Sequence, residues 1–248
     1  MNDDASWPRL AAALGLPPTV ALDGMRWTGD DLPGVAMESA GPLPAALAAA
    51  SARRRSQYLA GRHCARRALR QAGAADQPVG RGDDGLPVVP PGWHLSISHA
   101  EGVALALAAR TRDVAMLGVD IERWLTDATA AEVGPMVASS ADVATLRAAT
   151  GLDAAQAVTL LFSAKESLYK ALYPTVRQFV DFDGACLASA APGTLTLRLA
   201  RDWHPAWPAG ACTAVGWAGQ ADGVVTAVWQ RAPLPPHGAM AYGAADRR

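Results

Sequence analysis

The stretch Leu117-Gly118-Val119-Asp120-Ile121-Glu122 decides the fold prediction, because an apolar strand ends there in two carboxylates. Side chains alternate between the two faces of a strand, so Asp120 and Glu122 point to the same side. Two oxygen ligands therefore converge at one strand end. An isolated pair of this kind is more often a polar strand end that meets solvent, so its meaning depends on the rest of the chain.

The strand that contains this stretch, predicted over residues 114–121, follows two other apolar segments. These cover residues 94–98 and 103–109, and Glu101-Gly102 predicts a turn between them. The three segments together predict an antiparallel meander. A shorter strand is predicted earlier, over residues 19–22.

Two helices are predicted, one before these strands in the sequence and one after them. One covers residues 51–71 and is closed by Gly73 in the position of a C-cap. The other covers residues 153–172, begins with a DxxQ spacing that suits a capping box, and is expected to stop at Pro174.

Three more strands, over residues 195–199, 212–217 and 224–229, follow the second helix. The order of a helix and three strands therefore occurs twice. It predicts an α+β fold of two halves, each a three-stranded antiparallel sheet with packed helices. The predicted boundaries are 1–118 for the N-terminal half, 119–232 for the C-terminal half and 233–248 for a flexible tail.

The second helix carries a polar stripe on an otherwise apolar surface. Its members, at helical spacing, are Ser163, Glu166, Ser167 and Lys170. An acid and a base four residues apart also occur as an ordinary surface pair. If the stripe lines a cleft instead, Glu166 would join the two strand-end carboxylates. Three oxygen ligands favour a hard cation such as magnesium, which often shares substrate phosphates, and so imply a diphosphate substrate.

The first helix supplies the opposite charge. Its arginines are Arg53, Arg54, Arg55, Arg62, Arg66, Arg67 and Arg70, and no acid occurs between residues 39 and 75. The spacing puts Arg55, Arg62 and Arg66 on one face, and guanidinium groups suit phosphate oxygens. A solvated basic face is the alternative interpretation. The chain contains only two lysines, Lys165 and Lys170, and all its other permanently basic residues are arginines.

Composition indicates a globular cytoplasmic protein. The 248 residues are 50% hydrophobic and carry a net charge of −1. The three cysteines are far apart, which argues against a zinc site or a disulfide framework. The start of the chain is acidic where a secretory signal would be basic, and no apolar run approaches the roughly 18 residues of a membrane span.

Four motifs in order resemble the Sfp-type phosphopantetheinyl transferases, and most of all the branch with the enterobactin-synthase and mycobacterial-type enzymes. They are GRHCARRAL at 61–69, SISH at 96–99, GVDIE at 118–122 and FSAKESLYKA at 162–171. The resemblance implies a pseudo-twofold α+β fold with a cleft between its halves. It also implies magnesium-dependent transfer of the phosphopantetheine arm of coenzyme A to a serine of an acyl or peptidyl carrier protein, with release of adenosine 3′,5′-bisphosphate.

The resemblance also assigns residues. The magnesium ligands would be Asp120, Glu122 and Glu166. The catalytic residues would be Glu166, Lys170 and Lys165. The residues around coenzyme A would be Arg54, Arg62, Arg81, Ser98, His99, Lys165 and Lys170. Glu166, or a hydroxide bound to the metal, would deprotonate the carrier serine, and Lys170 would protonate the leaving nucleotide.

One turn departs from the family pattern. Many relatives have a lysine in a Gly-Lys-Pro turn near the nucleotide, whereas this chain has Gly85-Leu86-Pro87. Arg81 is the candidate substitute.

Two other functions use the same residues. A metal-dependent phosphodiesterase or nuclease would also need three carboxylates, and a nonenzymatic RNA-binding protein would use the arginine-rich helix. No basic and aromatic interleaving typical of an RNA-recognition sheet is present, and the overall charge is not basic. We therefore expect coenzyme A and a carrier protein as partners, no nucleic acid, no membrane and a monomer.

Overall fold

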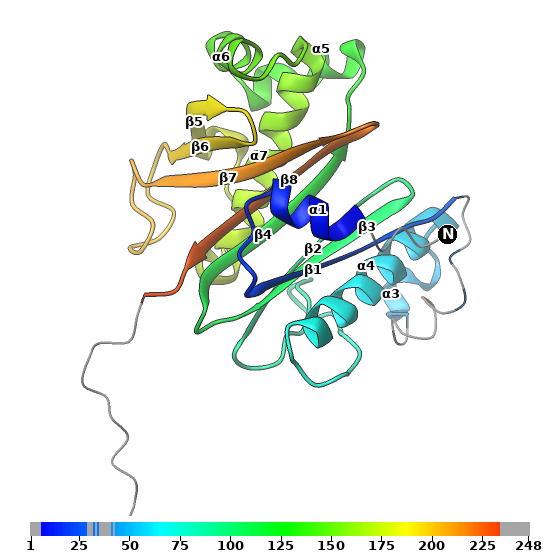
Figure 1. Ribbon diagram of the computed structural model, residues 1–248. Helices are drawn as coiled ribbons and strands as arrows, with labels where there is room; N and C mark the ends of the chain where they lie inside the picture. Colours follow the sequence, from blue (N-terminus) through cyan, green and yellow to red (C-terminus); the bar gives the residue numbers. More distant parts are fainter. Residues whose placement is uncertain (1–5, 29–31, 33, 35–40, 42, 234–248) are drawn as a thin grey trace, which may run out of the picture.

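Two antiparallel sheets with helices packed on them make up the fold of the computed structural model, which describes residues 6–28, 32, 34, 41 and 43–233 (Figure 1). The helices are α1 Ser6–Ala13, α3 Ala45–Ala48, α4 Ala52–Gln71, α5 Asp127–Val137, α6 Ser140–Thr150 and α7 Ala154–Val176, with a 3-10 turn at Phe182–Gly184. The strands are β1 Val20–Arg26, β2 Trp93–Ala100, β3 Val103–Arg110, β4 Val114–Arg123, β5 Ala185–Ala191, β6 Thr194–Leu199, β7 Cys212–Gln220 and β8 Gly223–Arg231. The predicted α+β class with two halves is confirmed.

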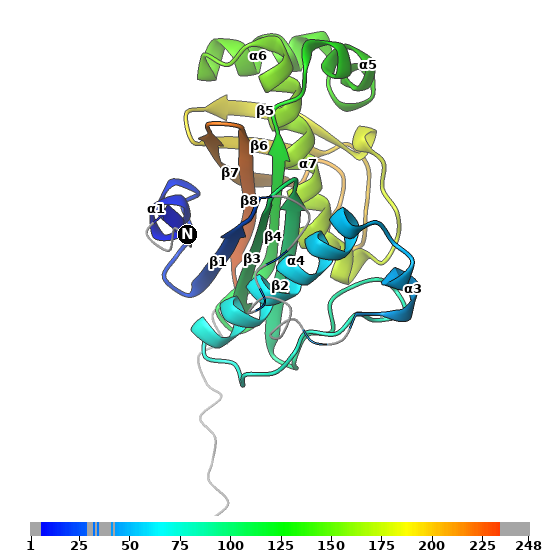
Figure 2. The same ribbon diagram turned by 90° about the vertical axis from the view of Figure 1, so that its right-hand side faces the viewer.

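The N-terminal sheet has the strand order β1-β3-β2, and α4 covers one of its faces (Figure 2). β3 presents Ala104, Ala106 and Ala108 to this helix, and all three are fully buried. Small side chains let the helix approach the sheet closely, and a Cβ on Gly61 would lie only 3.0 Å from Cγ2 of Ile97 in β2. The arginine-rich helix is thereby fixed against β2.

The C-terminal sheet has the order β4-β8-β7-β6-β5, with every pair antiparallel. Leu160, Leu161 and Leu168 of α7 pack on it with Val215 and Val228. The sheet has five strands instead of the predicted three. β5 was missed because its sequence, mostly alanine with one serine, carries no apolar and polar alternation.

β4 is the strand at the junction of the halves. The predicted meander was wrong for this strand, because β4 pairs with β8 and not with β3; Val119 lies opposite Ala227 and Ile121 opposite Val225. The apolar side chains of β4 contribute to a core cluster that includes residues of β8. The proposed division between residues 118 and 119 falls within β4 and stays a prediction.

The N-terminal segment runs from one half to the other. β1 belongs to the N-terminal sheet, yet Leu10 and Leu14 share a core cluster with Val225 and Ala227 of β8. The indole nitrogen of Trp229 donates to the carbonyl oxygen of Gly15 at 3.1 Å. The two halves therefore share part of their core.

The helix ends agree with the predictions except at one point. Ser51 caps α4, and Gly73 follows its end with a φ of 93°. Asp153 begins α7 with both bonds of a capping box. Pro174 does not stop α7, since a proline in the last turn costs only one helical hydrogen bond; the helix ends where Arg177 adopts a left-handed φ of 55°.

The predicted tail, residues 233–248, lies outside the described residues except for Pro233. Within the described part of the chain, no helix combines the length and the apolar surface needed to cross a membrane.

Candidate functional site

A cavity of about 620 Å³ lies between the two halves. α4 contributes Arg54, Tyr58 and Arg62 to its lining, β2 contributes His99, and the C-terminal part of α7 contributes Lys170. Residues of the loop 81–87 complete one wall. The cavity thus brings motifs from both halves together.

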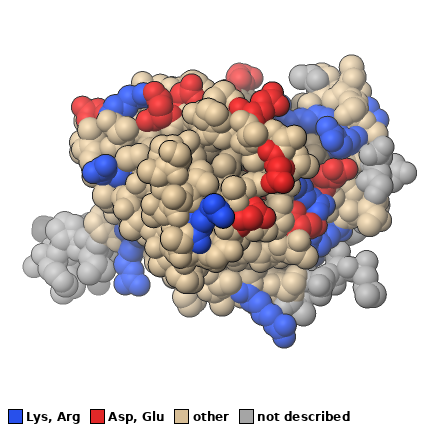
Figure 3. Space-filling view, turned by 90° about the horizontal axis from the view of Figure 1, so that it is seen from above, with Lys and Arg blue, Asp and Glu red and all other residues tan. Residues whose placement is uncertain are grey.

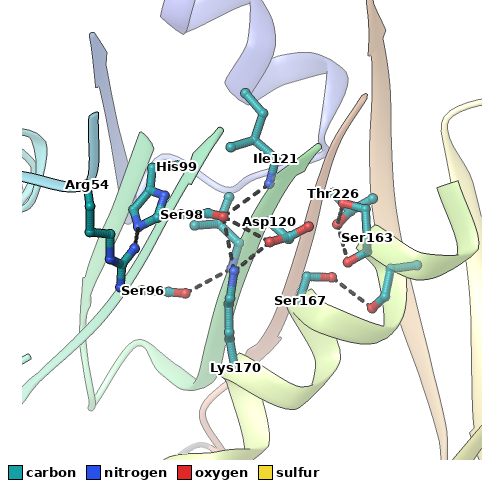
Figure 4. Close-up of polar contacts among 12 residues, drawn as sticks. Arg54, Ser96, Ser98, His99, Asp120, Ile121, Ser163, Ser167, Lys170 and Thr226 are labelled. Carbon is teal, nitrogen blue, oxygen red and sulfur yellow. Dashed lines mark hydrogen bonds and ion pairs between the residues drawn. The ribbon is translucent and has the colours of Figure 1, made fainter. Parts of the chain in front are cut away.

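Asp120, Ser98 and Lys170 form a compact buried network beside this cavity (Figure 4). The Ser98 hydroxyl donates to Asp120 Oδ1 at 2.9 Å, and Lys170 Nζ donates to the same oxygen at 2.5 Å and to Ser98 Oγ at 3.0 Å. Asp120 is only 1% exposed, and its Oδ2 is buried with no hydrogen-bond partner among the described residues. One carboxylate oxygen is therefore fixed by two donors, while the other makes no such bond within the described part of the chain.

Glu122 and Glu166 lie close enough to Asp120 to perturb one another. Burial, together with the negative charges of Asp120 and Glu166, raises the pKa of Glu122 to about 8. Burial also raises the pKa of Glu166, with Asp120 adding to the shift and Lys170 opposing it. A bound cation would favour the ionised forms of Glu122 and Glu166, whose pKa values are raised in its absence.

These carboxylates fit a magnesium ion only as a partial ligand set. Among the described residues, no group of three His, Cys, Asp or Glu side chains is arranged closely enough to hold a metal ion. The free Oδ2 of Asp120 is an available oxygen ligand, and Lys170 neutralises the other oxygen. Magnesium keeps several waters and shares substrate phosphates, so few protein ligands suffice for it.

Gly118 explains how α7 reaches this network. A Cβ on Gly118 would lie 2.0 Å from the carbonyl oxygen of Ser167 and 2.7 Å from the amide nitrogen of Ala171. Only a residue without a side chain lets the helix backbone come so close to β4. This approach places Glu166 and Lys170 over the carboxylate end of the strand.

The predicted polar stripe on α7 divides into two parts. Glu166 and Lys170 reach the site, whereas Ser163 shares a 2.9 Å hydrogen bond with Thr226 and Ser167 donates to Ala164 within the helix. Both serines are fully buried. Their hydroxyls lie in the contact between the helix and the sheet, and do not line the cavity.

The arginines of α4 also divide, by whether they have an acidic partner. Arg66 pairs with Asp76 and Arg67 pairs with Asp23, acids that lie outside the helix and that the acid-free stretch concealed. In the described part of the chain, Arg62 has neither an ion pair nor a hydrogen bond, although it is only 6% exposed. It stacks on Tyr58, with its Cζ 4.9 Å from the ring centroid. A buried cation without a counter-charge indicates an anionic ligand.

His99 presents a second donor without a partner. Burial, aided by the nearby positive charges of Arg54 and Lys170, lowers its pKa to about 4. The neutral ring accepts a hydrogen bond at Nε2 from Arg54 at 3.2 Å, so its proton is on Nδ1. Nδ1 is buried, and no hydrogen-bond partner for it occurs among the described residues. An acceptor such as a phosphate oxygen bound against the ring would satisfy it.

Lys165 lies away from this network. Its amine donates to the carbonyl oxygens of Val137 at 2.8 Å and Phe182 at 2.7 Å, and burial lowers its pKa. It borders a smaller cavity of about 80 Å³ beside Glu166, lined on its aromatic side by Tyr169 and Phe179. Its side chain points away from the network of Asp120, Ser98 and Lys170, and its role at the diphosphate stays a prediction.

Arg81 and Leu86 both line the large cavity, and the guanidinium of Arg81 lies over Gly85. Sequence reasoning missed a second arginine here. Arg177, at the end of α7, forms an ion pair with Asp84 of the same loop. Its only signal in the sequence was its position just after the second helix.

Two family models match the chain. A model of the 4′-phosphopantetheinyl transferase N-terminal domain matches residues 43–109, and a model of the 4′-phosphopantetheinyl transferase superfamily matches residues 116–221. Together they cover well over half of the sequence.

Similar proteins include enterobactin synthase component D of Salmonella typhi, 39% identical over 153 residues, with 62% of each chain covered. The 4′-phosphopantetheinyl transferase PptT of Mycobacterium tuberculosis is 36% identical over 154 residues, which are 58% of this chain and 63% of the relative. The matched part therefore spans less than two thirds of these relatives.

Proposed function

The chain belongs to the 4′-phosphopantetheinyl transferase superfamily, and we propose that it transfers the phosphopantetheine group of coenzyme A to a serine of an acyl or peptidyl carrier protein. Adenosine 3′,5′-bisphosphate is the product that leaves. The resemblance predicted from the four motifs is confirmed, and the activity is inferred from it and from the site.

One observation carries this proposal. The cavity has the unpaired cation Arg62 and the unpartnered Nδ1 of His99 on one wall, and Asp120 with its unpartnered Oδ2 beside the other. The phosphates of a nucleotide would pair with Arg62 and accept a hydrogen bond from His99. A divalent cation that also contacts a diphosphate would bind Asp120 Oδ2. Coenzyme A offers both kinds of phosphate in one molecule.

In the proposed reaction, the oxygen of the carrier serine attacks the phosphorus that bears the pantetheine arm. The bond from that phosphorus to the bridging oxygen breaks, and the electron pair stays on the departing nucleotide phosphate. Glu166 accepts the proton of the serine, and burial raises the pKa of this carboxyl above its ordinary value. Lys170 neutralises or protonates the departing phosphate.

Positioning supplies much of the acceleration in such transfers. Arg54, Arg62 and His99 would hold the nucleotide phosphates, and Arg81 would contribute from the wall formed by the loop 81–87. Ser98 orients Asp120. Lys165 could act at the diphosphate only after leaving its two carbonyl partners. Asp120, Glu122 and Glu166 would act as a partial ligand set that shares a magnesium ion with the substrate phosphates, and this ion when bound supplies charge neutralisation for the diphosphate.

The partner and the cellular setting are part of the proposal. The relatives named enterobactin synthase component D favour a carrier domain of a siderophore or other secondary-metabolite synthase. We infer a cytoplasmic monomer; its three cysteines are free thiols, as expected in a reducing compartment.

The pairing of Arg66 and Arg67 with acids argues against an RNA-binding protein, since it removes two cations from the basic helix. On the face shown in Figure 3, basic side chains are scattered among acidic ones and broad neutral areas, without forming a continuous basic surface.

The test is a mass measurement. The protein is incubated with coenzyme A, magnesium and a panel of apo carrier proteins, and the carriers are examined for the added arm at their serine. Parallel incubations contain EDTA or single-stranded RNA and DNA. Addition of the arm that EDTA abolishes supports the proposal. Cleavage of nucleic acid without carrier modification would overturn it in favour of the nuclease.

A further inference from the structure

β2 and β4 lie side by side at the junction of the halves (Figures 1 and 2). β2 pairs through its backbone with β3, and β4 pairs with β8. Among the described residues, β2 and β4 exchange no backbone hydrogen bond. The buried edge of β4 that faces β2 must therefore find other partners for its N–H groups.

Two serine hydroxyls supply these partners. Ser96 Oγ accepts from the amide nitrogen of Val119 at 3.0 Å, and Ser98 Oγ accepts from that of Ile121 at 3.3 Å. Both pairs are spaced by two residues, because alternate N–H groups of a strand point to the same edge. The serines occupy the place that carbonyl groups of a neighbouring strand would fill. We call this junction the serine seam: Ser96, Ser98, Val119 and Ile121.

The two serines of the seam differ in their remaining bonds. A hydroxyl has one donor and two acceptor positions. Ser98 uses all three, on Ile121, Lys170 and Asp120. Ser96, only 5% exposed, makes a single hydrogen bond in the described structure, to Val119. Ser96 therefore joins the strands without touching a carboxylate of the site.

We propose that Ser96 is a positioning residue, which sets the spacing between β2 and β4 and thereby places Asp120 against the phosphate-binding groups of the other half. Val119 directly precedes Asp120, so a shift of the Val119 backbone moves the carboxylate. His99 and Arg54 lie on the other side of the seam. The catalytic part of this inference rests on the proposed function, whereas its structural part does not.

The expected effect follows from the burial of Val119, whose relative exposure is 0%. Without the Ser96 hydroxyl, the buried N–H group has no partner, and a water must enter or the strands must shift to satisfy it. Catalytic groups tolerate little displacement, since a misplacement of about 1 Å can cost about 100-fold in rate. Ser96 also lines the large cavity, so the proposal requires that its loss act through the position of Asp120 and leave the affinity for coenzyme A nearly unchanged.

The structural test is amide hydrogen exchange, measured by NMR on Ser96→Ala without ligands. The Val119 amide should exchange at least roughly tenfold faster than in the wild type, while the Ile121 amide, still bonded to Ser98, should keep most of its protection. Unchanged protection at Val119, or equal loss across all of β4 and β8, would overturn the proposal.

The catalytic test compares three variants in carrier modification and in coenzyme A binding without magnesium. Ser96→Ala should raise the magnesium concentration for half-maximal rate about fivefold or more, with coenzyme A affinity within about twofold of wild type. Ser96→Thr keeps the hydroxyl and should restore amide protection and magnesium response together. Restoration of one without the other would contradict the proposal.

Thr159→Ala is the matched control, because it removes a buried hydroxyl that also accepts from a backbone amide, that of Leu125 at 3.1 Å, outside the seam. It should leave the magnesium response unchanged. If Thr159→Ala shifts that response as much as Ser96→Ala, general destabilisation explains both and the inference fails. If the wild type modifies no carrier, the proposed function fails, and the exchange experiment still tests the seam.

Discussion

The two long helices face the cavity from opposite halves, and they leave their charges in different states. On α4, Arg62 is buried and has no acidic partner among the residues that the structure describes. On α7, Lys170 is already bonded to Asp120 and Ser98. The difference indicates that the α7 side is assembled before any ligand binds, whereas the α4 side is completed by the ligand. Substitutions on the two sides should therefore have different effects.

The largest effect is expected for Asp120→Ala on the assembled side. It removes a candidate metal ligand and also leaves Lys170 without its acidic partner, so the rate should fall roughly 100- to 1,000-fold. Single-turnover transfer with limiting magnesium measures the loss. Glu132→Ala, at an exposed position of α5, is the control with a normal rate. Wild-type transfer by Asp120→Ala would remove Asp120 from the site.

Lys170→Arg should lose about 100-fold in single-turnover rate with saturating coenzyme A and carrier. The amine fits between Ser98 and Asp120, where a planar guanidinium is too large, and arginine hardly releases a proton. Lys170→Ala should lose as much. Arg147→Lys on α6 is the control for a conservative exchange at an exposed position. A near-normal rate in Lys170→Arg would show that charge alone is needed.

A pair of substitutions on α4 separates ligand binding from stability. Arg62→Met should raise the Kd for coenzyme A about 10- to 100-fold, because a charge-assisted contact to phosphate is lost. Its free energy of unfolding should stay level or rise without ligand, since an unpaired buried cation is removed. Calorimetry and urea unfolding measure the two quantities.

Arg67→Met is the matched partner, since Arg67 on the same helix pairs with Asp23, which is 2% exposed. It should leave the Kd nearly unchanged and lower the free energy of unfolding by about 1 to 3 kcal/mol. If both variants weaken coenzyme A binding equally, the division between paired and unpaired arginines has no functional meaning.

The smallest effects concern pH and have opposite signs on the two sides. His99 has a folded pKa of about 4, below its usual 6.5. As pH falls from 6.5 to 4, the unfolded chain takes up the proton first, so this residue makes the metal-free protein less stable. Glu122 has a folded pKa of about 8, above its usual 4.5. As pH rises from 4.5 to 8, the unfolded chain loses the proton first, so stability falls.

Unfolding of the metal-free protein at several pH values, compared with His99→Gln and Glu122→Gln, measures these contributions. His99→Gln should reduce the loss of stability on acidification, and Glu122→Gln should reduce the loss toward pH 8. NMR titration of His99 should give a midpoint near 4. A midpoint in the ordinary range near 6.5 would contradict the neutral ring.

Sequence reasoning could reach the residues whose role depends on local spacing. The i and i+2 positions brought Asp120 and Glu122 to one face, and helical spacing brought Glu166 and Lys170 above them. It missed α5 and α6, whose alanine-rich sequences carry no clear periodic apolar face. It also missed that β4 leaves the meander, because apolar alternation does not say which neighbouring strand a strand will choose.

The parts of the site that depend on tertiary partners were out of reach. Asp23 and Asp76 neutralise two arginines from outside the helix, so the acid-free stretch overstated the free positive charge. Lys165 lies next to Glu166 in the sequence but points about a third of a turn away on the helix, toward backbone carbonyls. Only the packing of α5 and the 3-10 turn reveals those acceptors.

The course of α1 has a consequence for how the chain folds. Leu14 and Gly15, just after α1, contact strands that lie more than 200 residues later in the chain. The Trp229 indole donates a hydrogen bond to Gly15 across 214 positions. Leu14 packs over Gly216 of β7. Contacts between such distant segments form slowly, because the entropy of closing a long loop is lost before the contacts contribute any stabilising free energy. During synthesis, the first helix therefore waits for the last two strands. The protein should become resistant to proteolysis only when β7 and β8 have emerged from the ribosome.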